Sequence, residues 1–248
     1  IYRIPVARRG LLITGPSGSG KSSLLDGIAA VLTPDSWLRF NLAAQGAGTR
    51  SDQRGLMSYV RGAWTRRTDD FEDRVTSEYL RPGPTWSGIL LRYENGVDAP
   101  VTLTRLFHVS GTKTAAADLK SLYVLERSPA DLRDLEPFAR GGLETRKLQA
   151  AFPDALVAAG GKTARFYQRM RSLFGIPDES ALQLLHKTQS AKNLDSLNQL
   201  FRESMLERPE TFALAETARA QFGELNDAHE HVVRLRQQRD HLARLRDA

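Results

Sequence analysis

Three features of the 248-residue sequence predict an α/β fold. A glycine-rich stretch at residues 15–22 lies between an apolar run and a segment with helical spacing. Several strand-like runs follow in the middle of the chain, and a charged segment with helical periodicity closes it. We therefore expect a mixed sheet flanked by helices in residues 1–206 and a long helix over residues 207–248.

The glycine-rich stretch matches a phosphate-binding loop. Residues 15–22 read GPSGSGKS, which fits the P-loop pattern G-x-x-x-x-G-K-[ST]. The apolar residues 11–14 predict a buried strand before the loop, and residues 23–32 predict a helix after it. The nucleotide-binding residues predicted by this pattern are Gly15, Pro16, Ser17, Gly18, Ser19, Gly20, Lys21, Ser22 and Ser23.

The chemistry of this loop follows from its residue types. Glycines let backbone N–H groups converge on phosphate oxygens, and the start of the helix adds its partial positive charge. Lys21 would reach the β- and γ-phosphates, and the hydroxyl of Ser22 would coordinate Mg²⁺. A chance GKS in a glycine turn is the alternative, but the flanking strand and helix argue against it.

The middle of the chain predicts several strands. Residues 1–6 alternate apolar and polar side chains and read as a strand. Residues 87–93 and 101–107 read as a hairpin, because their link contains the turn-forming pair Asn-Gly. Residues 122–126 predict one more strand.

Two segments resemble catalytic motifs without completing them. A Walker B strand ends in Asp, often followed by Glu, whereas here a lone Glu126 is followed by Arg127. We interpret this run as an ordinary strand. Residues 160–163 read GGKT but lack the upstream glycine of a phosphate loop, so they predict a turn.

Basic residues alternate with aromatic ones in residues 50–67. Arginines lie beside Tyr59 and Trp64, a pattern that suits a nucleic-acid or nucleotide surface. A solvated helix with Leu56, Tyr59 and Val60 in the core explains the pattern equally well. Both interpretations stay open at this point.

The C-terminal segment has the periodicity of a coiled coil. From about residue 207 glycine is nearly absent and charge is dense. Apolar residues recur at heptad spacing and would form a narrow stripe along one side of a helix. A stripe of this kind suits pairing with another helix, although an amphipathic helix packed on its own domain is the alternative. The apolar residues of two heptad series are Ala218, Leu225 and Val232, and Ala228, Leu235 and Leu242.

The amino-acid composition limits the classes of protein to which the chain can belong. The chain is 41% hydrophobic and 26% charged, the profile of a soluble globular protein, and its net charge of +6 permits a nucleic-acid partner. It has no cysteine, which excludes disulfides and thiolate metal sites and fits a reducing cytoplasm. No apolar run is long enough to span a membrane. Because the chain opens on Ile1 in strand-like sequence, we expect a piece of a longer protein.

The assembled pattern resembles the N-terminal head lobe of an SMC-like ATPase. The loop motif carries the resemblance to the superfamily, and the Tyr-Val-Arg-Gly stretch at 59–62 points to the MukB-like branch. Within that branch the chain is most similar to the C subunit of Wadjet plasmid-defence systems. The stretches that carry the resemblance are residues 15–28, 41–44, 51–62, 185–190 and 201–206.

The resemblance implies a function and partners. Two heads would engage with ATP and Mg²⁺ between them, and Gln189 would be the Q-loop glutamine that contacts Mg²⁺ and the attacking water. Arg54 or Arg61 would sense nucleotide or DNA. The implied partners are a C-terminal head lobe, a second copy of the head, kleisin and kite-type subunits and double-stranded DNA. The implied location is the cytoplasm, at the nucleoid.

The resemblance also shows which motifs of the family this sequence lacks. The signature motif and the Walker B Asp-Glu pair of the family are not found in this sequence, so catalytic residues remain unknown and we expect negligible ATPase activity from this chain alone. Two other functions stay open. One is a self-contained small kinase with Glu126 or Asp131 near the phosphates. The other is a non-catalytic module that binds DNA and tethers partners through its helix.

Overall fold

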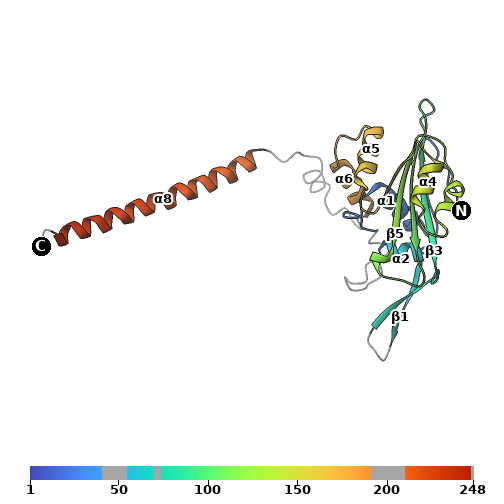
Figure 1. Ribbon diagram of the computed structural model, residues 1–248, viewed down its shortest axis with the longest axis horizontal. Helices are drawn as coiled ribbons and strands as arrows, with labels where there is room; N and C mark the ends of the chain where they lie inside the picture. The colour runs from blue at the N-terminus through green and yellow to red at the C-terminus, as the bar shows by residue number, and fades with distance from the viewer. Residues whose placement is uncertain (41–54, 70–73, 191–209, 247–248) are drawn as a thin grey trace. The chain divides into compact units, whose positions relative to one another are not determined.

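The computed structural model describes residues 1–40, 55–69, 74–190 and 210–246, in two compact units (Figure 1). One unit comprises residues 1–195 and the other residues 196–248. The predicted boundary at residues 206 and 207 lies outside the described residues and stays a prediction. None of the described helices is long and apolar enough to cross a membrane.

A four-stranded antiparallel sheet forms the centre of the first unit. Its strand order follows the sequence, and the register between the first two strands pairs Thr85 with Val109 and Tyr93 with Val101. The predicted hairpin and the strand at 122–126 are therefore confirmed. The mixed sheet is not found among the described strands, which all pair antiparallel. The strands are β3 (Thr85–Tyr93), β4 (Val101–Val109), β5 (Lys120–Glu126) and β6 (Leu156–Ala159).

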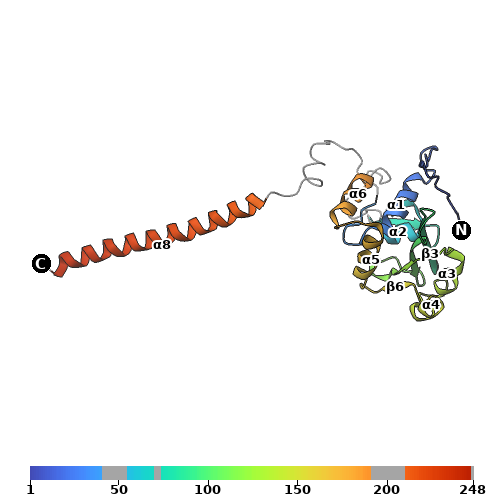
Figure 2. The same cartoon turned by 90° about the horizontal axis from the view of Figure 1, so that it is seen from above.

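Helices cover both faces of this sheet (Figure 2). Successive side chains of a strand point to opposite faces, so each strand contributes residues to the core on both sides. Leu103 and Phe107 of β4 pack toward α1, α2 and α5, whereas Leu106 packs toward α3 and α4. Since both faces of β4 are covered, Thr102 to Val109 are all buried. The helices are α1 (Lys21–Leu32), α2 (Leu56–Arg61), α3 (Leu132–Leu135), α4 (Thr145–Ala151), α5 (Ala164–Phe174) and α6 (Ser180–Ser190), with short 3₁₀ turns at Ala116–Asp118 and Glu136–Phe138.

A separate two-stranded ribbon extends from this body (Figure 1). It consists of β1 (Ala63–Asp69) and β2 (Arg74–Tyr79), paired antiparallel. The solvated helix considered for residues 50–67 is therefore present only as the short α2. Gly62 ends that helix with φ +67°, a left-handed conformation that glycine adopts without strain, and the chain turns into β1.

The N-terminal segment differs from the prediction. Residues 1–6 and 11–14 were expected to be strands, but residues 1–20 contain no strand and are exposed. Leu12 is 86% exposed and Ile13 39%. An apolar run becomes a strand only when a neighbouring strand takes up its backbone hydrogen bonds, and no described strand lies beside this one.

The second unit contains one long helix, α8 (Glu210–Arg246), which confirms the predicted helical C-terminus. Apolar residues of both heptad series are exposed, among them Leu225 at 69% and Leu242 at 65%. A single helix cannot bury such a stripe by itself. Its pairing with a second helix remains a prediction.

A buried arginine holds α1 on the sheet. The guanidinium of Arg105, on β4, donates to the backbone oxygen of Ala30 at 2.7 Å and to Oδ1 of Asp35 at 2.6 Å. It lies over the rings of Phe107 and Tyr123, with 4.8 and 4.5 Å from Cζ to the ring centroids. The C-terminal end of α1 is thereby fixed to the centre of the sheet.

Replacing Arg105 by leucine should lower the free energy of unfolding by about 2–3 kcal/mol, because the carbonyl of Ala30 would lose its donor inside the core. Urea titration followed by circular dichroism measures this. The matched control is Arg92→Leu, which removes an exposed ion pair with Glu94 and should cost less than about 1 kcal/mol. Equal losses in the two variants would contradict this role for Arg105.

Candidate nucleotide-binding site

The predicted phosphate loop leads directly into the N-terminus of α1. Gly18 and Gly20 have φ angles of +81° and +89°, so the loop uses the left-handed conformation twice. Gly20 is the N-cap of α1, and no acidic residue lies in the first turn of the helix. The exposed N–H groups and positive end of α1 are therefore available to an anion.

The ammonium group of Lys21 folds back over the loop. Its Nζ donates to the backbone oxygens of Gly15 and Pro16, both at 2.7 Å, and lies 3.3 Å from Oγ of Ser19. The cation is thus placed above the arc of backbone that the motif predicts to surround phosphate. Phosphate oxygens accept the same three donors, so an anion in this arc would be met by a positive charge already in place.

Gly15 lies beside the side chain of Ser19 within the loop. A Cβ atom at this position would lie 2.8 Å from Oγ of Ser19, closer than carbon and oxygen approach without a bond. A larger residue would therefore force the hydroxyl of Ser19 to rotate away.

Tyr59 of α2 positions the start of α1, a role that the sequence did not reveal. Its hydroxyl donates to the backbone oxygen of Ser23 at 3.0 Å, in the first turn of α1. Gly27 makes this contact possible, because a Cβ there would lie 2.8 Å from the same hydroxyl. The ring of Tyr59 also contacts that of Phe40 at 5.4 Å between centroids. A glycine one helical turn after the loop was the signal available in the sequence.

Arg61 occupies a structural position, not the sensing position that the resemblance implied. Its side chain is fully buried and donates hydrogen bonds to five backbone carbonyls. With these donors used inside the protein, the guanidinium holds two loops together and is shielded from solvent. Arg54 lies outside the described residues, and its role stays a prediction. The five acceptors belong to Arg81, Pro82, Gly83, Gly111 and Lys113.

Gln189 lies in the last turn of α6, and the structure does not describe its side chain. One turn earlier, the ring of His186 accepts a hydrogen bond at Nε2 from the backbone N–H of Arg39, at 2.8 Å. Burial lowers the pKa of His186, which keeps the ring neutral and able to accept. This contact fixes α6 to the segment that follows α1. The role of Gln189 in binding Mg²⁺ stays a prediction.

The two carboxylates considered for a self-contained kinase lie at a helix cap and in a groove. Asp131 caps α3, where it accepts from the N–H of Arg133 at 3.1 Å, and it forms an ion pair with Arg3. Glu126 lines a groove to which no residue of the phosphate loop contributes. Among the residues that the structure describes, no group of three or more His, Asp or Glu side chains could hold a metal ion.

Comparison with known protein families supports the assignment of residues 15–22 as a phosphate-binding loop. Residues 1–47 match the family model described as the P-loop containing region of AAA domain. The search of curated proteins gave no match. The match supports a P-loop NTPase and covers the loop with its helix, whereas the antiparallel sheet and α8 lie beyond it.

Replacing Lys21 by alanine should weaken binding of a nucleoside triphosphate with Mg²⁺ about tenfold or more, because it removes the charge that meets the phosphates. Titration of a fluorescent ATP analogue measures this. The matched control is Lys162→Ala, since Lys162 belongs to the similar GGKT stretch but lies in the connection between β6 and α5. Unchanged affinity in Lys21→Ala would contradict the assigned site.

Proposed function

We propose that this chain is the ATP-binding half of an SMC-like ATPase head. The observation that carries the proposal is the phosphate loop at the start of α1, with Lys21 held over its backbone arc. ATP and Mg²⁺ are the proposed ligands, with Ser22 and Gln189 as the proposed metal contacts. The choice of ATP over GTP rests on the resemblance, since the loop contacts phosphates and not the base.

The exposed N-terminal segment favours completion by a second lobe. Tyr2 is 97% exposed and Leu12 86%, and the apolar run at residues 11–14 leads directly into the phosphate loop. A lobe that contributes strands on either side of this run would satisfy its backbone groups and bury its side chains. We propose that the C-terminal lobe of the same head does so.

The second lobe would also supply the missing chemistry. Phosphoryl transfer to water needs a carboxylate that holds Mg²⁺ and a group that orients the attacking water. Among the described residues, no group of three or more acidic or histidine side chains could hold the metal ion. In the proposed head, Walker B comes from the second lobe and the signature motif from the opposite head of an ATP-bridged dimer.

The long helix suits the start of an arm. At about 1.5 Å per residue, the 37 residues of α8 span about 55 Å. Its exposed heptad residues favour a partner helix of similar length. In a Wadjet-type or chromosome-organising complex, this arm and the ATP cycle would drive DNA translocation or loop extrusion at the nucleoid, with kleisin and kite-type subunits.

The isolated chain should bind ATP but hydrolyse it at a rate near background. Adding a lobe with Walker B and signature motif, fused or in trans, should restore turnover, measured as phosphate release. The control is the same mixture with Lys21→Ala, which should stay inactive. Robust turnover by the isolated chain would overturn the two-lobe proposal while leaving nucleotide binding intact.

A further inference from the structure

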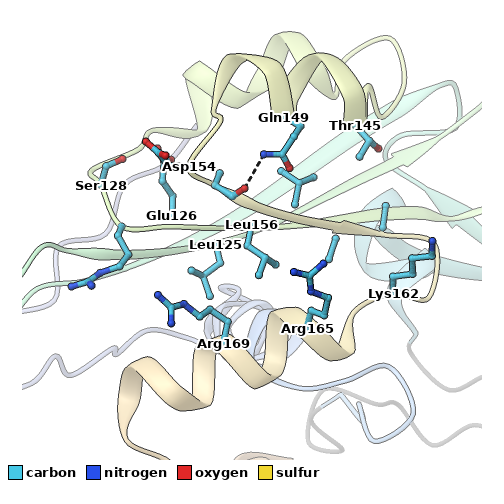
Figure 3. Close-up of a pocket in the computed structure, with 15 residues that line it drawn as sticks. Leu125, Glu126, Ser128, Thr145, Gln149, Asp154, Leu156, Lys162, Arg165 and Arg169 are labelled. Carbon is cyan, nitrogen blue, oxygen red and sulfur yellow. Dashed lines mark hydrogen bonds between the residues drawn. The ribbon is translucent and has the colours of Figure 1, made fainter.

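A groove of about 820 Å³ runs along the outer edge of β6, between α4 and α5 (Figure 3). Its floor includes Leu156 to Ala159, the whole of this short strand. Among the described strands β6 pairs only with β5, so its other edge presents backbone donors and acceptors to the groove. This groove is separate from the phosphate loop.

We propose that this groove binds an extended acidic peptide of a partner protein, which adds to β6 as a further strand. An extended peptide satisfies the free edge of a sheet with its own backbone groups.

The basic side chains in the walls of the groove favour a ligand with negative charge. Arg165 and Arg169 extend from α5 toward β6, and Lys162 lies at one end (Figure 3). All three are exposed, and none forms an ion pair with a residue that the structure describes. Their charge is therefore available to a ligand.

The spacing of the two arginines matches an extended peptide. Residues four apart on a helix have Cβ atoms about 6 Å apart. Alternate residues of a strand lie on the same side and are about 7 Å apart. An acidic residue at every second position would therefore place successive carboxylates opposite Arg169 and Arg165.

The far end of the groove argues against a nucleic acid. Glu126 and Asp154 lie there, away from Lys162 (Figure 3), and Arg127 also lines the groove. A nucleic acid carries a negative charge at every unit and would meet these carboxylates, whereas a peptide can place neutral residues beside them and acidic residues beside the arginines of α5. Oε2 of Glu126 is buried and accepts no hydrogen bond from the described residues.

The groove is held open by contacts within the protein. Nε2 of Gln149, on α4, lies 3.3 Å from the backbone oxygens of Phe152 and Pro153 and 3.0 Å from that of Ala155. These contacts fix the turn that leads into β6. A ligand would therefore meet an edge that is already ordered, which lowers the entropy cost of binding.

Fluorescence anisotropy with a labelled peptide, in which alternating aspartate and valine are followed by alternating serine and valine, tests the proposal. Arg165→Glu and Arg169→Glu should each weaken binding about tenfold or more. Arg146→Glu makes the same charge change on the exposed side of α4, outside the groove, and should weaken it less than about twofold. Circular dichroism checks that all three variants fold.

Two further probes decide the mode of binding. Methylation of alternate backbone nitrogens should abolish binding in one register and spare it in the other, because only one set pairs with β6. Lys21→Ala should bind the peptide normally, so failure here is distinct from failure of the proposed ATP site. No binding by the alternating peptide, equal loss in Arg146→Glu, or tighter binding of single-stranded DNA through the same arginines would overturn the proposal.

Discussion

The structure depends on how a charged side chain is buried at the centre of the sheet. Arg105 lies on β4 with no exposed surface, and burying a cation without partners would be prohibitive. Its donors meet the end of α1 and Asp35, while two aromatic rings cover its faces. Because these partners belong to α1 and the segment after it, the helix that bears the loop must lie in one place on the sheet.

The opposite end of α1 is fixed by a different contact. Tyr59 donates to the backbone oxygen of Ser23 beside Gly27, and neither Tyr59 nor Gly27 belongs to the predicted phosphate loop. A helix held at both ends keeps its first N–H groups in a constant direction. Such fixed donors cost no reorganisation when an anion binds.

Sequence reasoning succeeded where a feature is local. The loop motif specifies its own backbone conformation through glycine. The hairpin of β3 and β4 follows from Asn95, whose side chain accepts from the N–H groups of Val97 and Asp98 in the turn. The heptad pattern likewise identified the helix of α8, whose hydrogen bonds lie within the segment.

It failed where the outcome depends on distant residues. The strand expected at residues 11–14 needs a neighbouring strand to pair with, and the sequence of residues 11–14 does not show whether one is present. Arginine near aromatic residues fits a ligand surface as well as a buried clamp, and only the loops around Arg61 decide between them. The groove escaped notice because its lining comes from residues 125–169, which no single motif unites.

Helix α5 lines the groove and also packs against the helix that follows the phosphate loop. The inner face of α5 carries Phe166, Tyr167 and Met170, which pack in the same core cluster as Val31 of α1. The hydroxyl of Tyr167 donates to the backbone oxygen of Thr33, directly after α1, at 2.9 Å.

A second face of α5 carries Arg165 and Arg169, which line the groove. Since protein interiors are close-packed, a change in the position of α5 would displace Tyr167 from the end of α1. The C-terminal end of α1 is therefore held from two sides, by Tyr167 of α5 and by Arg105 of β4.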